Sequence, residues 1–293
     1  MLSFADIALG TASGVPRCMR CHRPIDEHFR DPSGVATEIR EVCQGWPGGS
    51  GPNIYLVGAE PLRHPALFEL LHAAVESGAA RIGLETDAHA LASREISSRA
   101  LRSGVRQLTV SVLGPNAERH DALSGRHGSY DQTVEGVRTF LDEAREGGVR
   151  VHLTFRVPVC RHNLREAPAI VTAACGFGAH AVILDVDDTD LDLNQASPWL
   201  EAACDTGVVN TTWVEVRGVP YGFARGWELH LASVYRLVSG DKAEACGDCA
   251  LGSVCGGAVS GASATVLASL APPPNATQVA ERVSHGFGSP RSG

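Results

Sequence analysis

Two periodicities alternate along most of the chain. Six short runs rich in β-branched residues have the length and composition of strands, at residues 4–8, 53–57, 81–85, 107–112, 149–157 and 180–185. Between strands, apolar residues recur at helical spacing, as in Leu67, Leu70, Leu71, Ala74 and Val75, and in Val134, Val137, Leu141 and Ala144. Strand and helix in alternation imply parallel strands with right-handed crossovers, in either an open doubly wound sheet or a barrel.

The positions of unusual polar residues favour the barrel. Residues 10–21, which include two cysteines, follow the first predicted strand, the Gly58-Ala59-Glu60-Pro61 turn follows the second, and Thr86-Asp87 follows the third. Ser111 and Arg156 lie near the ends of the fourth and fifth. Active sites of parallel barrels collect at the carboxyl ends of their strands. The predicted fold class is therefore α/β, a partial (β/α)6 TIM-type barrel with a small Cys-rich C-terminal extension.

Composition narrows the function classes. With 293 residues and 44% hydrophobic content, the chain can form one main domain with a smaller extension. A formal charge of −8 offers no basic surface for nucleic acid or anionic membranes, so neither is an expected partner. The N-terminal segment lacks the pattern of a secretory signal, which predicts a cytoplasmic protein. Its nine cysteines are then expected to bind metal or do redox chemistry rather than form disulfides.

Two short motifs suggest binding chemistry. Cys18 and Cys21, two residues apart in the loop after the first strand, can bind one metal centre, although they could also be two idle thiols. In the Gly58–Pro61 turn, glycine allows close approach of a ligand, and a carboxylate beside exposed carbonyls suits a ligand ammonium group. An ordinary turn is the alternative.

Taken together, these segments resemble a known family. The loop GVPRCMRCHRP resembles the CxxxCxxC signature of the radical SAM family, and IYLVGAEPLRHPALFELL resembles its GGEP segment. VSVLGPNAERHDALSG with GSYDQTVEGV resembles the strand and helix that follow, so that the resemblance covers residues 4–205. It implies a 4Fe-4S cluster held by three cysteines, with S-adenosylmethionine on the fourth iron. An electron from the cluster splits the sulfonium to give a 5′-deoxyadenosyl radical that abstracts hydrogen from the substrate.

The resemblance assigns residues to these cofactors. Cys18 and Cys21 would be cluster ligands, and the cofactor-binding residues would be Gly58, Ala59, Glu60, Pro61, Ser111 and, for the carboxylate of the cofactor, Arg156. The expected partners are a peptide or small-molecule substrate and an electron-donor protein. No catalytic residue is assigned.

The sequence also departs from the family pattern. Gly14 stands where the first cysteine is expected, Arg20 replaces a common aromatic residue, and Ala59 replaces the second glycine of GGEP. His22 or Cys43 could supply the third cluster ligand, since imidazole ligates iron in other clusters.

A second cysteine group lies near the C-terminus. Cys246, Cys249 and Cys255 fall within ten residues and precede two glycines. The group resembles the twitch or SPASM extension of radical SAM enzymes, which holds an auxiliary iron-sulfur cluster, but Gly222 stands where the upstream G-x-P-x-C supplies a ligand. Three thiolates could hold such a cluster, or zinc with water or His230 as fourth ligand. Three unliganded thiols are the alternative.

These observations predict a radical SAM-like barrel at residues 1–205, a Cys-rich extension at 206–262 and a flexible tail at 263–293. The leading hypothesis is an enzyme that binds a 4Fe-4S cluster and S-adenosylmethionine and modifies a peptide or small molecule. Gly14 and Gly222 support a different class, a catalytically dead pseudoenzyme acting as a binding or partner protein, with zinc or no metal. A zinc-stapled interaction protein is a third reading. The substrate is not identifiable from the sequence.

Overall fold

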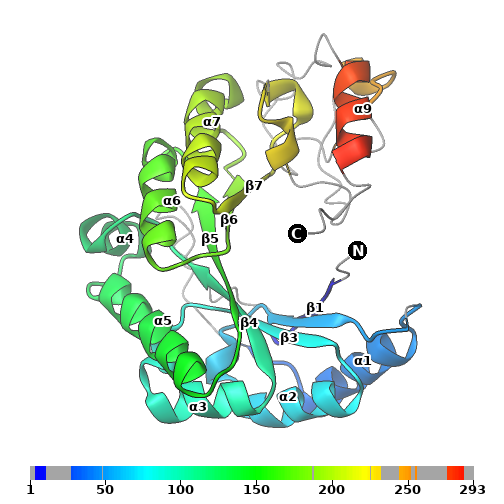
Figure 1. The fold of residues 1–293 in the computed structure, drawn as a ribbon, viewed down its shortest axis with the longest axis vertical. Helices are drawn as coiled ribbons and strands as arrows, with labels where there is room; N and C mark the ends of the chain where they lie inside the picture. The colour runs from blue at the N-terminus through cyan, green and yellow to red at the C-terminus, as the bar shows by residue number, and fades with distance from the viewer. Residues whose placement is uncertain are drawn as a thin grey trace. The chain divides into compact units, whose positions relative to one another are not determined.

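Seven strands form one sheet in sequence order. The computed structural model describes residues 4–10, 28–47, 49–186, 188–224, 226–231, 244–251, 255 and 276–286. The strands are β1 (Phe4–Ala8), β2 (Asn53–Val57), β3 (Arg81–Thr86), β4 (Val105–Ser111), β5 (His152–Val159), β6 (Ala181–Val186) and β7 (Trp213–Arg217), hydrogen-bonded in the order β1 to β7 (Figure 1). A doubly wound sheet reverses its strand order at a switch point, whereas a partial barrel does not. The α/β class and the partial-barrel topology are confirmed, with seven strands where six were expected.

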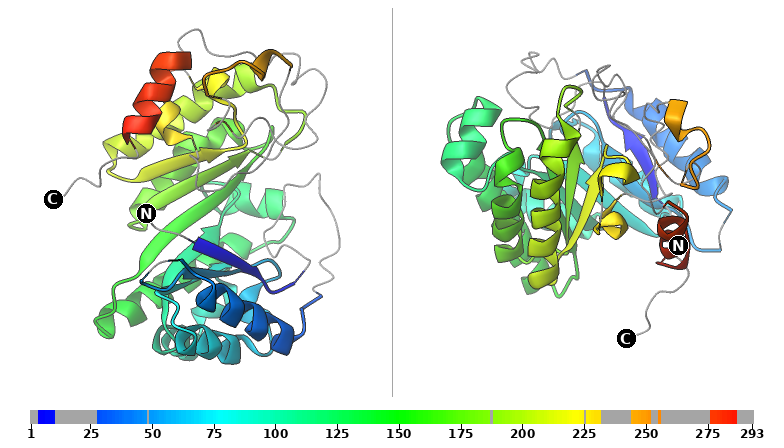
Figure 2. Two further views of the ribbon diagram at one scale, coloured as in Figure 1. Left: turned by 90° about the vertical axis from the view of Figure 1, so that its right-hand side faces the viewer. Right: turned by 90° about the horizontal axis from the view of Figure 1, so that it is seen from above.

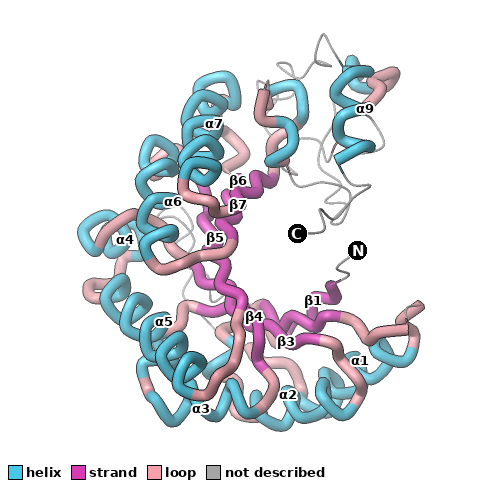
Figure 3. Tube along the Cα trace, in the orientation of Figure 1, coloured by secondary structure: helices cyan, strands magenta, loops and turns pink. Residues whose placement is uncertain are grey.

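Helices follow most strands, as Figure 3 shows. They are α1 (Pro32–Gln44), α2 (Leu67–Glu76), α3 (Arg94–Arg102), α4 (Ala117–Ser124), α5 (Ser129–Glu146), α6 (Ala167–Gly176), α7 (Leu193–Val209) and α9 (Ala276–Gly286). In the part of the chain that the structure describes, no helix combines the length and apolarity needed to span a membrane.

The chain divides into two compact units. Unit 1 comprises residues 1–156 and 176–180, and unit 2 comprises residues 157–175 and 181–293. In unit 1, α1, α2, α3 and α5 cover one face of the strands (Figures 1 and 2). The domain boundaries at residues 205 and 262 stay a prediction.

The two faces of the unit 1 sheet differ in chemistry. The face toward the helices carries the buried apolar residues Ile54, Leu56, Ile82, Leu84, Leu108, Val110, Leu153 and Phe155. Strand register places on the other face, here called the polar face, Tyr55, Gly83, Glu85, Gln107, Thr109, Ser111, His152, Thr154 and Arg156. The residues of β5 alternate between these two faces, and the Phe155 ring lies 5.8 Å from the Phe177 ring, centroid to centroid.

Two details of the helical and strand patterns were wrong. Val75, predicted on the apolar face of its helix, is 50% exposed, because eight residues of helix rotate a side chain about 80° away from the first position. β7, which follows α7, was not among the six predicted strands. The buried face of α7 includes the small residues Ala196, Ala203 and Gly207, which weaken its hydrophobic signal.

Candidate functional site

The carboxyl ends of β1 and β2 approach each other closely at Gly10 and Gly58. Gly58 has φ +95°, and a Cβ there would lie 2.8 Å from the Gly10 carbonyl oxygen. A Cβ on Gly10 would lie 2.5 Å from the His28 carbonyl oxygen and 2.7 Å from the Ala59 Cβ. Only glycine tolerates such approach.

The loop that carries the first cysteine pair starts and ends beside the Gly58–Pro61 turn. It leaves the sheet after Gly10, and the chain returns at His28, where Arg30 N donates to Leu9 O at 2.8 Å. Cys18 and Cys21, like Gly14, lie outside the described residues. Their assignment as cluster ligands therefore stays a prediction.

Glu60 ties the end of β2 to the end of β3. Its side chain is 1% exposed and accepts hydrogen bonds from Leu62 N (3.1 Å), Thr86 Oγ1 (2.5 Å) and Asp87 N (2.8 Å). Both carboxylate oxygens are therefore engaged within the protein. Contact of Glu60 with a ligand ammonium group stays a prediction. Within the protein, the carboxylate holds the Gly58–Pro61 turn against β3.

Asp87 extends this connection in two directions. Its carboxylate accepts from Arg63 Nη2 and from His89 N, each at 3.0 Å. His89 Nδ1 lies 3.5 Å from the Asp87 carboxylate, and His89 Nε2 lies 3.3 Å from Ser129 Oγ at the start of α5. Ser129 is buried, so this Asp-His-Ser series serves to attach α5 to the strand ends. The sequence indicated Thr86 and Asp87, which follow the third predicted strand, but it did not indicate their partners His89 and Ser129.

Burial raises the pKa of Glu60 from 4.5 to about 7, and the charge of Asp87 adds to the shift, against the three hydrogen bonds that lower it. The folded chain therefore binds this proton more tightly than the unfolded chain does. The resulting stability is fully present below about pH 4.5 and is lost as the pH rises through about 7.

This linkage predicts a pH-dependent difference between the natural chain and Glu60→Gln, which has no proton to lose. From about pH 4.5 to above pH 7, the free energy of unfolding of the natural chain should fall by up to roughly 3 kcal/mol relative to the variant. Denaturant unfolding at several pH values measures both. Parallel pH profiles would contradict the burial of an ionisable Glu60.

Ser111, at the carboxyl end of β4, and Arg156, three residues before the end of β5, are neighbours on the polar face. The two residues are paired in register. Ser111 is 1% exposed, and among the described residues its Oγ has no hydrogen-bond partner. Arg156 Nη1 donates to Glu85 Oε1 at 2.6 Å, so a ligand carboxylate would share this guanidinium with Glu85. The structure thus brings these two predicted residues together.

Cys43, one candidate for the third cluster ligand, lies near the far end of α1. α1 begins beside the end of β1, with Asp31 Oδ2 accepting from Gly34 N at 3.0 Å as its N-cap. Cys43 is near the opposite end of the helix, about 18 Å further along its axis. Burial also raises the pKa of the Cys43 thiol, which disfavours the thiolate. His22, the other candidate, lies outside the described residues.

The C-terminal cysteines lie in consecutive turns of unit 2. Cys249 N donates to Cys246 O at 3.2 Å, and Cys255 N donates to Leu251 O at 2.8 Å. All three thiols are half-buried. Over the described ranges, no three His, Cys, Asp or Glu side chains come together as a metal-binding group. Their role as ligands stays a prediction.

Tyr221 precedes Gly222, which stands where the family has its upstream cysteine ligand. Burial, followed by the charges of Cys255 and Glu228, raises the pKa of Tyr221 to about 12. Cys255 therefore lies near the residues around Gly222. His230 has a structural task, since its Nδ1 donates to Val214 O at 2.7 Å and its ring stacks on Trp213 at 5.0 Å between centroids.

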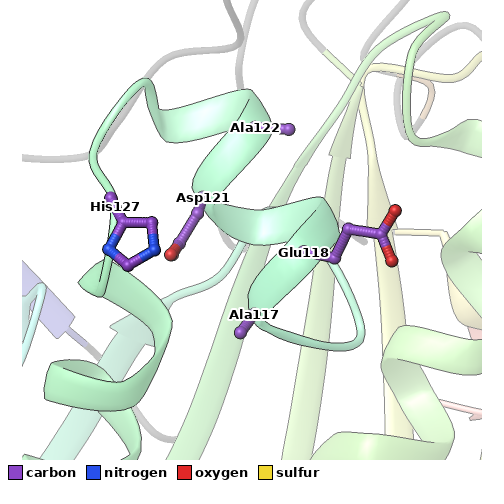
Figure 4. Close-up of a pocket in the computed structure, with 5 residues that line it drawn as sticks. All are labelled: Ala117, Glu118, Asp121, Ala122 and His127. Atoms are coloured by element: carbon purple, nitrogen blue, oxygen red, sulfur yellow. The ribbon is translucent and has the colours of Figure 1, made fainter.

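A surface pocket beside α4 does not form a second site. Its volume is about 390 Å³, and it is lined by Ala117, Glu118, Asp121, Ala122 and His127 (Figure 4). Asp121 accepts from Gly128 N (2.6 Å) and Tyr130 N (2.9 Å) and so caps α5. Figure 4 shows Glu118 pointing away from Asp121 and His127. These groups do not converge on a ligand.

Comparison with known proteins identifies a family and relatives of this chain. Residues 16–171 match the Radical SAM superfamily. The chain is 36% identical over 132 residues to an AdoMet-dependent heme synthase of Methanosarcina barkeri, covering 44% of this chain and 35% of that protein. A second AdoMet-dependent heme synthase, from Nitratidesulfovibrio vulgaris, is 26% identical over 144 residues, with 49% and 37% covered. The matched segment thus spans about a third of the length of these relatives.

Solved structures resemble the fold. Streptococcus suis SuiB bound to precursor peptide SuiA aligns with TM-score 0.55 at 13% identity, covering 72% of this chain and 47% of that one. Native anSMEcpe with bound AdoMet and Cp18Cys peptide aligns with TM-score 0.57 at 12% identity, covering 74% and 64%. At such identities the likeness shows the fold alone.

Proposed function

Because this chain belongs to the radical SAM superfamily, whose members use a 4Fe-4S cluster and S-adenosylmethionine, we propose that it binds both and modifies a peptide or small-molecule substrate by radical chemistry. The observation that carries the proposal is the Ser111 hydroxyl at the end of β4, which is buried and has no hydrogen-bond partner among the described residues. Leaving a buried hydroxyl unsatisfied costs about 1–3 kcal/mol, which a polar group of a ligand would offset.

The residues present fit S-adenosylmethionine. The Gly58–Pro61 turn follows β2, Ser111 ends β4, and Arg156 of β5 pairs with Ser111 in register, near the edge where barrel ligands bind. Because the Glu60 carboxylate is engaged within the protein, the backbone carbonyls of the turn would accept hydrogen bonds from the ammonium group of the cofactor. Ser111 would form a hydrogen bond to the cofactor. Arg156, which also pairs with Glu85, would bind the carboxylate of the cofactor. When bound, the cofactor supplies a 5′-deoxyadenosyl radical after receiving an electron. The task of these residues is to hold it in one orientation.

The thiols in the sequence do not complete the family's cluster site. Cys18 and Cys21 supply two ligands, and Gly14 has no donor atom. We propose these two cysteines as ligands and leave the third unassigned, so no step of the reaction is derived through the cluster. For Cys246, Cys249 and Cys255 we propose an auxiliary iron-sulfur cluster or zinc in a SPASM-like extension.

The proposed substrate class rests on what the relatives are named as and bound to. The curated relatives are named as heme synthases, and the two structural relatives are bound to peptides. We extend to this chain only the common element, an organic substrate that is a peptide or a small molecule, with an electron-donor protein as partner in the cytoplasm. The alternative of a pseudoenzyme is favoured by Gly14 and Gly222, each at the position of an expected ligand.

Replacing Ser111 tests the cofactor site. Ser111→Ala should weaken S-adenosylmethionine binding about tenfold without lowering the free energy of unfolding of the ligand-free chain, because the hydroxyl makes no hydrogen bond to the described residues. Calorimetric titration of the anaerobic chain measures the affinity.

Ser97→Ala is the matched control. Ser97 is equally buried, but its Oγ donates to Leu91 O at 2.6 Å. This variant should lose about 1 kcal/mol of stability and keep its affinity for S-adenosylmethionine. Unchanged affinity in Ser111→Ala would place the cofactor elsewhere.

A further inference from the structure

A second buried polar atom on the polar face has no partner and no place in the proposed cofactor site. Gln107 is 4% exposed, and no group in the described part of the chain donates a hydrogen bond to its Oε1. It lies on β4 four residues before Ser111, hence on the same face and about 13 Å from it along the strand. A buried carboxamide oxygen without a donor is unfavourable and is normally satisfied by water or a ligand.

An aromatic ring lies beside this carboxamide. Strand register sets Tyr55, Gly83, Gln107 and His152 in one row across β2 to β5. A Cβ on Gly83 would lie 2.5 Å from Tyr55 Cε1, so the tyrosine ring lies across Gly83 in the direction of Gln107. Neighbouring strands are about 4.8 Å apart, which leaves the ring and the carboxamide adjacent. The glycine is what makes room for the ring.

An irregularity in β4 brings Gln107 into this row. The pairing between β3 and β4 shifts between Ile82 and Gly83, so that Ile82 pairs with Val105 and Gly83 with Gln107. Arg106 is the extra residue, and its guanidinium donates to Leu101 O and Val105 O at 2.8 Å. Bulges of this kind occur beside active sites, where they redirect a side chain.

An ion pair and a neutral imidazole lie close to the row. Glu85 and Arg156, on neighbouring rows of the polar face, form an ion pair at 2.6 Å. Burial, then the charges of His180 and Arg81, lowers the pKa of His152, which keeps its imidazole neutral near pH 7. Asp6, which pairs in register with Tyr55 from β1, adds a carboxylate at the edge of this row, whereas Gln107 and the Tyr55 ring offer an uncharged group a hydrogen-bond acceptor and a ring face.

We propose that Gln107 and Tyr55 form a substrate subsite that binds an uncharged planar group bearing an N–H donor, such as a peptide or side-chain amide. The N–H would donate to Gln107 Oε1, and the plane of the group would pack on the Tyr55 ring. The inference rests on the proposed function for the identification of the ligand as substrate, but neither the cluster nor S-adenosylmethionine is needed to test it.

The experiment is NMR titration of the full chain with N-methylacetamide, a peptide unit without side chains. Methyl acetate is the matched probe, since it has nearly the same shape with an ester oxygen in place of the N–H. The reporters are the Gln107 side-chain amide, assigned by its loss in Gln107→Leu, and the Tyr55 ring, which remains in that variant. Both signals should shift saturably with N-methylacetamide, and methyl acetate should bind at least about tenfold more weakly.

In Gln107→Leu the Tyr55 response to N-methylacetamide should weaken by the same factor. Equal responses of the natural chain to the two probes, or no saturable response, would overturn the subsite. Titration of the same sample with S-adenosylmethionine separates the two proposals. Amide binding without cofactor binding would reject the proposed function alone, and the reverse result would reject the subsite alone.

Discussion

Replacing Glu60 by alanine is expected to lower the free energy of unfolding by about 4 kcal/mol at about pH 6. The substitution leaves three buried donors without their acceptor, the N–H groups of Leu62 and Asp87 and the hydroxyl of Thr86. It also opens a cavity where the strand ends meet. The loss should be larger than for an ordinary carboxylate because Glu60 joins two strand ends rather than one local turn.

Denaturant unfolding of Glu60→Ala measures this loss, with Glu146→Ala as a carboxylate-deletion control. Glu146 is exposed and pairs with Arg94 on the surface, so its removal should cost no more than about 1 kcal/mol. Glu60→Gln keeps one acceptor and the side-chain volume, and should lie between the two. If Glu60→Ala lost no more than Glu146→Ala, the carboxylate would not be the connection that the structure shows.

Introducing a third thiol is expected to produce the largest gain of function. Gly14→Cys should increase the rate of 5′-deoxyadenosine formation from S-adenosylmethionine, with dithionite as reductant, by at least about tenfold. The natural chain offers two thiolates from this loop, and loss of even a supporting group around a metal site commonly costs tenfold or more in affinity. A thiol at position 14 would restore the spacing of the family signature.

Gly222→Cys is the matched control at the second cysteine group. It should raise iron or zinc retention without changing 5′-deoxyadenosine formation, since it lies in unit 2, far along the chain from the first pair. Adding Cys18→Ala to Gly14→Cys should abolish the gain. Activity found only in Gly14→Cys, and none in the natural chain, would identify the natural protein as a pseudoenzyme.

The strands and their polar ends were predictable because they depend on local pattern. The runs at residues 4–8 and 53–57 coincide with β1 and β2, and Ser111 ends β4 as expected, whereas Arg156 lies three residues before the end of β5. β7 was missed although Trp213 to Arg217 alternates with period two, with Val214 and Val216 buried. The short length of this strand and the small residues of α7 before it hid the alternation.

The task of Glu60 could not be read from the sequence. Its partners Thr86 and Asp87 are 26 and 27 residues away, and only the parallel pairing of β2 with β3 brings them to its carboxylate. For Cys43, the residue type was evident from the sequence, but not that α1 places it about 18 Å along the helix axis from the end of β1. Gln107 did leave a signal, since it precedes Thr109 and Ser111 at the spacing of one strand face.

The most direct test of the central claim is the iron content of the natural chain after anaerobic reconstitution with iron and sulfide, beside the double variant Cys18→Ala/Cys21→Ala. The natural chain should be brown and hold about four or more irons per molecule, and the double variant should lose about four of them together with S-adenosylmethionine binding. A colourless natural chain that holds zinc or no metal, or an iron content unaffected by the double substitution, would contradict the account.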